Sequence, residues 1–385
     1  MENHEPEKSK LNILIVTGEE SGDTYAGRLA RSFLDLNEGI KIEGIGGPKM
    51  REAGARTFYD ISQMSVMGIL PILGRIRFFF RVLAELKARI ANGEYDAVVL
   101  IDYPEFNMKL AEYARGRGVP VFYYVCPQVW AWRRYRTRKI ARNFDLVFVV
   151  FPFEQEFYEK RGIKARFLGH PILDEYEAPD DANKTREEFG ANSGETLVGI
   201  APGSRNHEVK KMLPVMLEAT KIIQKTRPVK LVIPCAKSVD EDLVRKTLEQ
   251  AGVKAAIVKG KMWNVISVCD FLICKSGTST LQAAITETPM VIVYKSDFIG
   301  YAMVRLLAHT KWAGLPNILA GKEVIPELLQ GDATPEAIAA TALPYITDVS
   351  RRNQMRDELK FIHKSLGQPG ASSRAAKVIV DYIKG

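Results

Sequence analysis

The 385-residue chain contains only four cysteines, and their spacing argues against two common uses of the residue. Cys126, Cys235, Cys269 and Cys274 are scattered along the chain, so the sequence does not predict a disulfide framework. Cys269 and Cys274 have four residues between them rather than two, and no pair of histidines accompanies them, which argues against a zinc site. We therefore expect buried free thiols.

Long apolar segments are also missing. No run approaches the roughly 18 apolar residues that a membrane-crossing helix requires. Residues 1–10 are polar and charged, so we expect no secretory signal and place the protein in the cytoplasm. Lys and Arg outnumber Asp and Glu by 54 to 46, a basic balance that suits nucleic acid, anionic lipid or phosphorylated substrates. Because no nucleic-acid-binding motif is present, we expect no nucleic-acid partner.

What the chain does have is a regular alternation of strand and helix patterns. Its length favours two α/β domains, and the alternation predicts open, parallel, doubly wound sheets. We expect a first domain over residues 1–175, a second over 176–350, and closing helices over 351–385; a return of the last helix to the first domain or to a partner chain is one hypothesis. The predicted strands are Asn12–Thr17, Ile42–Ile45, Ala97–Ile101, Val121–Val125, Leu146–Phe151, Leu197–Ile200, Leu231–Pro234, Ala256–Val258, Phe271–Cys274 and Met290–Tyr294.

Two loops of small residues follow strands in the second half and precede helical patterns, at Ala201–Arg205 and Lys275–Thr280. Such loops leave backbone N–H groups free at a helix N-terminus, where they attract phosphate. The first loop adds the guanidinium of Arg205, which can bind phosphate in a bidentate manner. Together the two loops indicate a nucleoside diphosphate site.

The first half has a glycine loop, Gly18–Asp23, and a carboxylate, Asp102, at the end of a strand. Tight strand-to-helix turns need glycine in any case, so the loop alone is as compatible with a structural role as with a functional one. Its acidic residues disfavour phosphate and favour a hydroxyl-rich ligand such as a sugar. Asp102 could cap the following helix or form a turn, or it could act as a general base where open α/β sheets bind ligands.

Two segments combine aromatic with basic side chains. Residues Leu70–Ile90 predict an amphipathic helix that either packs on the sheet or lies in an anionic membrane surface, and the sequence does not separate these hypotheses. Residues Tyr123–Arg134 are compatible with core packing and with a phosphate or an anionic headgroup.

Nine short motifs occur in a fixed order along the chain: Gly18–Asp23, Gly46–Pro48, Val66–Gly68, Ile101–Asn107, Pro127–Trp132, Gly169–Pro171, Pro202–Arg205, Ser276–Thr278 and Leu315–Ile318. In this order they resemble the motifs of lipid-A-disaccharide synthases, from about residue 12 to residue 330. The resemblance implies a GT-B fold, with two Rossmann-like domains facing a central cleft. It implies an inverting transfer from UDP-2,3-diacylglucosamine to 2,3-diacylglucosamine 1-phosphate (lipid X), which gives a β-1′,6-linked disaccharide and UDP, with neither a metal nor another cofactor.

The resemblance also implies roles for individual residues. Asp102 would be the general base for the acceptor hydroxyl, Arg205 would hold the departing diphosphate, and Glu19 would orient a sugar. Contacts to the nucleotide or the donor are expected from Gly203, Ser204, Arg205, Ser276, Gly277, Thr278, Ser279, Gln282 and Asn317. Contacts on the acceptor or sugar side are expected from Ser21, Gly22, Asp23, Met67, Gly68, Trp130 and Arg133, and contacts to membrane from Arg77, Phe78, Phe79, Phe80 and Arg81.

Three positions depart from the family pattern. Gln282 stands where a glutamate usually holds the ribose, Cys126 replaces a serine, and Glu105 replaces an aspartate. The alternatives are another UDP-sugar transferase or a sugar-nucleotide epimerase of the same fold, and a nucleotide sensor without enzymatic activity. The expected partners are the two acylated substrates and the anionic inner face of the inner membrane, and a homodimer is a further hypothesis.

Overall fold

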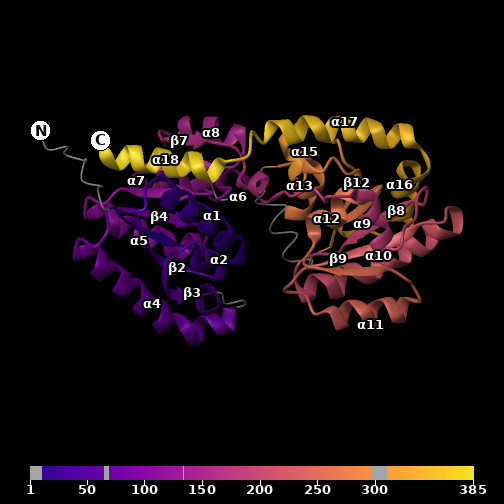
Figure 1. Ribbon diagram of the computed structural model, residues 1–385, viewed down its shortest axis with the longest axis horizontal. Coiled ribbons are helices and arrows are strands. Elements are labelled where there is room, and N and C mark those ends of the chain that lie inside the picture. Colours follow the sequence, from indigo (N-terminus) through magenta and orange to yellow (C-terminus); the bar gives the residue numbers. More distant parts are fainter. Residues whose placement is uncertain (1–10, 65–68, 133, 296–309) are drawn as a thin grey trace, which may run out of the picture. The chain divides into compact units, whose positions relative to one another are not determined.

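The computed structural model describes residues 11–64, 69–132, 134–295 and 310–385 (Figure 1). The chain divides into two compact units, one formed by Met1–Asp174 with Leu366–Gly385 and the other by Glu175–Ser365. Each unit is built on one sheet whose strands are all parallel, which confirms the predicted α/β class. All four cysteines are buried and free, as expected.

The first sheet has the strand order β3-β2-β1-β4-β5-β6-β7, which places β1 between β2 and β4. Its strands are β1 (Asn12–Val16), β2 (Lys41–Gly46), β3 (Arg56–Asp60), β4 (Ala97–Ile101), β5 (Val121–Tyr124), β6 (Leu146–Val149) and β7 (Ala165–Phe167). Its helices are α1 (Glu20–Leu36), α2 (Pro48–Glu52), α3 (Ile61–Met64), α4 (Ile69–Ala91), α5 (Pro104–Gly116), α6 (Val129–Trp132), α7 (Thr137–Asn143), α8 (Pro152–Glu159) and α18 (Ala371–Lys384), with 3-10 turns at Arg134–Arg136 and Pro171–Glu175.

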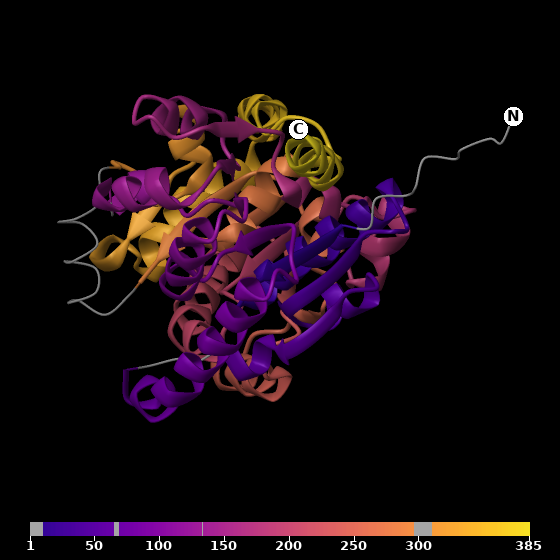
Figure 2. The same cartoon turned by 90° about the vertical axis from the view of Figure 1, so that its left-hand side faces the viewer.

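Both faces of this sheet are covered, and the alternation of side chains along β1 explains how. Ile13 and Ile15 face a cluster that contains residues of α1 and α18, whereas Leu14 and Val16 face a second cluster with residues of α4 and α5. Figure 2 shows the C-terminal helix and α4 on opposite sides of the sheet. A sheet buried on both faces needs near-continuous apolar strands, which is why the central strands were recognisable.

The second sheet has the strand order β10-β9-β8-β11-β12-β13, so β8 and β11 are neighbours. Its strands are β8 (Leu197–Ala201), β9 (Lys230–Cys235), β10 (Ala256–Lys259), β11 (Phe271–Lys275), β12 (Met290–Tyr294) and β13 (Glu327–Leu329). Its helices are α9 (Ala182–Glu188), α10 (Asn206–Thr226), α11 (Glu241–Ala251), α12 (Met262–Val268), α13 (Thr278–Ile285), α15 (Leu315–Ala320), α16 (Pro335–Thr347) and α17 (Val349–Ser365), with a 3-10 turn at Gln330–Asp332.

The sequence prediction found the edge strand β10 but missed the other three outermost strands, β3, β7 and β13. They are three to five residues long, and β3 and β13 are only partly buried. An edge strand has no need of a continuous apolar pattern because one side has no neighbouring strand and its side chains remain partly in solvent. Of the closing helices, α17 belongs to the second unit and α18 to the first.

Candidate active site

Asp102 directly follows β4, and its backbone is held in an unusual conformation. Asp102 and Tyr103 both have positive φ, 48° and 47°, a region that residues other than glycine rarely adopt. The Asp102 main-chain oxygen accepts hydrogen bonds from Asn107 Nδ2 at 2.7 Å and from Tyr123 Oη at 2.9 Å. Asp102 does not cap α5, whose N-cap is Tyr103, so the capping interpretation fails.

The Asp102 carboxylate makes no hydrogen bond or ion pair with the residues that the structure describes. Burial raises its pKa to about 7, and the negative charge of the exposed Glu19 acts in the same direction. Because β1 and β4 are paired, the loop that carries Glu19 and the end of β4 meet at one edge of the sheet. A partly ionised carboxylate near neutral pH is suited to take a proton from a hydroxyl group.

The glycine loop packs directly against this carboxylate. A Cβ atom at Gly22 would lie 2.0 Å from Thr17 Oγ1 and 3.3 Å from Asp102 Oδ2, and one at Gly18 would lie 2.5 Å from the Tyr103 ring. Glycine at both positions therefore lets the loop approach Asp102 closely. Ser21, also in this loop, is exposed.

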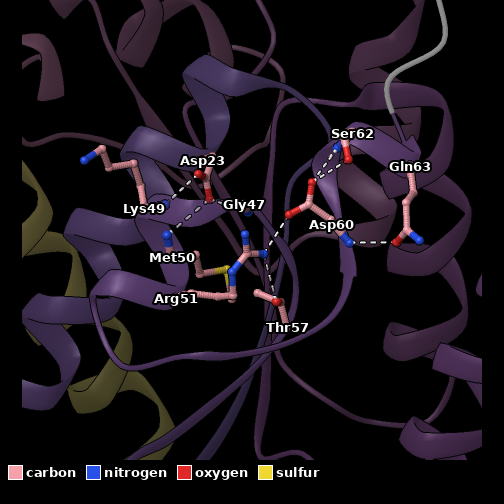
Figure 3. Close-up of polar contacts among 9 residues, drawn as sticks. All are labelled: Asp23, Gly47, Lys49, Met50, Arg51, Thr57, Asp60, Ser62 and Gln63. Atoms are coloured by element: carbon pink, nitrogen blue, oxygen red, sulfur yellow. Dashed lines mark hydrogen bonds and ion pairs between the residues drawn. The ribbon is translucent and has the colours of Figure 1, made fainter.

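The Asp23 carboxylate is used within the fold, and its expected role on the sugar side stays a prediction. Its carboxylate is buried and accepts the main-chain N–H groups of Gly47 at 2.6 Å, Lys49 at 2.9 Å and Met50 at 3.2 Å (Figure 3). It thereby satisfies the N-terminus of α2, where a negative charge is stabilised by the unpaired donors. In the same view Arg51 pairs with Asp60 at 2.7 Å.

Trp130 is also a structural residue rather than an exposed ligand contact. Its indole N–H, the single donor of that side chain, donates to Oε1 of the buried Glu154 at 2.6 Å. The other oxygen of Glu154 accepts the N–H groups of Val150 and Phe151. Trp130 therefore anchors α6 to the start of α8. Met67, Gly68 and Arg133, which were expected on the same side, lie outside the described residues.

The expected membrane-facing residues of α4 divide into two sets. Phe78 and Phe79 are half-buried against the core, with Phe78 in edge contact with Tyr59. Phe80 is 55% exposed, and Arg77 and Arg81 are exposed as well. Among the described residues, no helix is both long enough and apolar enough to cross a membrane.

Sequence reasoning missed an apolar cavity of about 410 Å³ beside Tyr103. The apolar patterns of α4 and α5 were the only sequence signal for this cavity. Which faces of the two helices would leave a space could not be known before the helices were packed. Its lining comes mainly from α4 and α5 and comprises Met64, Ile76, Phe79, Phe80, Leu83, Tyr103, Pro104, Glu105, Phe106 and Lys109.

In the second unit, the loop before α10 is held by a residue that the sequence analysis overlooked. Glu208 Oε2 accepts the Ser204 N–H at 3.0 Å. The sequence analysis expected the N–H groups of this loop to be free for phosphate, but the Ser204 N–H is already bonded to Glu208. Glu208 Oε1 pairs with Lys275 Nζ at 2.9 Å and lies 3.9 Å from Arg205 Nη1. Burial favours the neutral carboxyl, but the hydrogen bond and charge of Lys275 prevail and lower the Glu208 pKa. The sequence signal for this role was a glutamate in the first turn of the helix that follows the loop, a position from which a carboxylate can accept main-chain N–H groups.

The loop before α13 lies at the end of the neighbouring strand β11. Gly277 has a φ of 156° and Thr278 is exposed at the first turn of the helix. The Ser276 hydroxyl donates to the Ala313 carbonyl at 2.8 Å and its N–H donates to Val293, so Ser276 is largely used by the fold. Ser279 and Gln282 lie on α13 itself, and both are half-buried.

The side chain of Asn317 is used within the fold, and its expected contact to the nucleotide stays a prediction. Its amide nitrogen donates to the Ile325 carbonyl and to Glu327 Oε1, both at 2.7 Å. Its oxygen accepts from Val324 at 2.8 Å and from Ile325 at 2.9 Å. A carboxamide has two donor hydrogens and two acceptor lone pairs, so the buried side chain is fully satisfied.

Structural comparison places both units in a known architecture. Over 98% of this chain and 97% of the other, the fold is similar to a putative UDP-N-acetylglucosamine 2-epimerase from Listeria monocytogenes, with a TM-score of 0.68 at 14% identity. The Acinetobacter baumannii MurG structure matches with a TM-score of 0.59 at 16% identity, over 97% and 99% of the two chains. At such identities the likeness establishes only the GT-B fold.

Sequence comparison is more specific. The lipid-A-disaccharide synthetase family model matches residues 13–380. The lipid-A-disaccharide synthase of Geobacter sulfurreducens is 38% identical over 98% of both chains, and that of Syntrophus aciditrophicus is 38% identical over the same shares. With a family model that spans nearly all of its length and relatives this similar, the chain belongs to the lipid-A-disaccharide synthase family.

Proposed function

We propose that the protein joins UDP-2,3-diacylglucosamine to lipid X, forming the β-1′,6-linked disaccharide 1-phosphate and UDP. The observation that carries the proposal is the Asp102 carboxylate, whose pKa of about 7 and closeness to the glycine loop suit proton removal from a sugar hydroxyl. Family membership supplies the two substrates and the direction of transfer.

In the proposed step, Asp102 takes the proton of the acceptor 6-hydroxyl. The acceptor oxygen then forms a bond to C1 of the donor sugar from the face opposite the nucleotide, and the bond between C1 and the diphosphate oxygen breaks with its electrons on UDP. Arg205, whose side chain is about half exposed, stabilises the negative charge that grows on the diphosphate. Inversion at C1 follows because attack and departure occur on opposite faces.

The surroundings of Asp102 suit an acylated acceptor. The apolar cavity begins at Tyr103, the next residue in the chain, and its volume of about 410 Å³ is in the range of small-molecule sites. We assign it to one acyl chain of the acceptor. The exposed Phe80, Arg77 and Arg81 support binding of α4 to an anionic membrane, from which such an amphiphile would be drawn.

The test is to incubate the protein with both substrates in detergent, beside Asp102→Asn, and to detect the disaccharide 1-phosphate by mass spectrometry. Product from the wild type and little from the variant would support the reaction and the base together. Product from both would retain the enzyme but remove Asp102 from its role. Absence of product from the folded wild type would contradict the proposal and direct attention to other UDP-sugar chemistry.

A further inference from the structure

Lys275, the last residue of β11, carries an ammonium group between the two loops of the second unit. Its Nζ atom lies 2.9 Å from Glu208 Oε1, and a Cβ atom at Gly277 would be 3.8 Å from it. The Tyr294 ring centroid is 5.5 Å away. The ammonium therefore contacts α10 through Glu208 and also lies at the loop that begins α13.

This ion pair differs from the surface pairs of the same unit. The Lys275 and Glu208 side chains are 17% and 12% exposed, whereas those of Lys322 and Glu358, which pair at 2.8 Å, are 60% and 44% exposed. Removing two charges from water costs free energy that their mutual attraction often does not recover. A partly buried pair at a proposed ligand site therefore suggests a function other than stability.

We propose that Lys275 is a second cation for the diphosphate of the bound nucleotide, and that Glu208 holds its ammonium in place until that diphosphate enters. The inference rests on the proposed function, which requires a UDP site in this unit. Lys275 and Arg205 approach the same oxygen of Glu208, so one carboxylate serves as counter-ion to two cations in the unliganded protein.

The exchange that this arrangement permits follows from charge. A nucleoside diphosphate brings more negative charge than one carboxylate, so it can attract both cations away from Glu208. Glu208 still accepts the Ser204 N–H through its other oxygen, and the loop keeps its anchor while Lys275 turns to phosphate. Glu208 then acts against the ligand as a nearby like charge, and its neutralisation should strengthen nucleotide binding.

The experiment measures UDP and uridine binding to the full chain by isothermal titration calorimetry. The variants are Lys275→Met, Lys275→Arg, Glu208→Gln and the double variant K275M/E208Q, with Lys322→Met as a control that breaks the exposed pair. We expect Lys275→Met to weaken UDP binding by about tenfold or more, as for loss of a charge-assisted contact, and to leave uridine binding unchanged. Lys275→Arg should restore most of the affinity, Glu208→Gln should tighten UDP binding severalfold, and the control should match the wild type.

The double variant separates a direct contact from an effect on folding, since it contains neither of the two partly buried charges. If Lys275 touches the diphosphate, the double variant keeps a UDP defect of about tenfold relative to Glu208→Gln. Recovery of wild-type affinity in the double variant would overturn the inference, and so would equal losses for UDP and uridine in Lys275→Met. A folded wild type that binds no UDP would instead overturn the proposed function, and with it this inference.

Discussion

Asn107 Nδ2 donates to the main-chain oxygen of Asp102 at 2.7 Å, so the start of α5 holds the backbone of the residue that directly follows β4. The same amide donates to the Ile101 carbonyl at 3.1 Å. These bonds keep Asp102 in its left-handed conformation and leave its carboxylate to the site. The proposed base is thus positioned through its main chain rather than through a hydrogen bond to its carboxylate.

The rate of disaccharide formation should depend on the ionisation of Asp102. Its pKa is raised to about 7, and the base acts only when deprotonated, so kcat/KM should rise with pH and level off above about 7. Asp102→Asn should lower the rate by about 10²–10⁴-fold and abolish this limb of the profile. An identical profile in the variant would show that another group titrates.

Asp102→Asn should also stabilise the folded protein above neutral pH. Between about 3.8 and about 7 the unfolded chain loses this proton before the folded one does, so ionisation lowers the free energy of unfolding as pH rises. The advantage of the variant should be small at pH 4, grow toward pH 7, and level off at about 4 kcal/mol above it, since the pKa rises from 3.8 to about 7. Urea denaturation at several pH values measures it, and a pH-independent difference would contradict the raised pKa.

Removing the Asp23 carboxylate should affect stability more than substrate binding. Asp23→Ala leaves three buried or partly buried N–H groups near α2 without their acceptor, and should lower the free energy of unfolding by about 2–4 kcal/mol. Glu20→Ala, at an exposed acid one turn away, is the control and should change stability by less than about 0.5 kcal/mol. An Asp23→Ala protein of normal stability that fails to turn over would restore the sugar-side interpretation.

Asn317→Asp should destabilise the second unit. The new carboxylate cannot donate to the Ile325 carbonyl and would face Glu327, so we expect a loss of about 2–4 kcal/mol in unfolding free energy. Thermal unfolding measures the loss, and UDP titration below the transition measures the effect on the ligand. A stable variant that has lost UDP affinity would support the original nucleotide assignment.

Phe80 and Phe78 should respond differently to substitution by serine. Phe80→Ser should weaken binding to vesicles of equal parts phosphatidylglycerol and phosphatidylcholine severalfold and leave stability unchanged, because Phe80 is exposed. Phe78→Ser should lower stability by about 1–3 kcal/mol because Phe78 packs on the core. Charge reversal at Arg77 and Arg81 should weaken vesicle binding more at low salt than at high salt. Vesicle sedimentation measures the binding of these variants, and unchanged binding in every variant would refute a membrane role for α4.

Much of the fold was predictable because it depends on local pattern. Buried central strands such as β1 and β4 need apolar residues on both faces, and their patterns appear directly in the sequence. The edge strands β3 and β13 escaped prediction because partly exposed strands carry no such pattern. The position of Asp102 was likewise readable, since it directly follows a continuous apolar strand.

The partners of polar side chains were not predictable. Asp23 meets the start of α2 because β1 pairs with β2, and Glu208 meets Lys275 because β8 pairs with β11. In each case the two groups are far apart in the chain and become neighbours only when the sheet forms. Asn317 differs, because its partners Val324, Ile325 and Glu327 lie only seven to ten residues further along the chain, yet its amide is wholly used within the fold.

By itself, the sequence determined the α/β class, the family and the residue types that end each strand, because apolar periodicity and motif order are properties of the chain alone. Only the tertiary structure decided which of those residues remain available for chemistry. Burial and the charge of Glu19 raise the pKa of Asp102, and hydrogen bonds within the fold bind Asp23, Trp130 and Asn317 into the scaffold. A polar side chain is available for chemistry only if no neighbouring group in the folded protein already binds it, and folding decides which groups become neighbours.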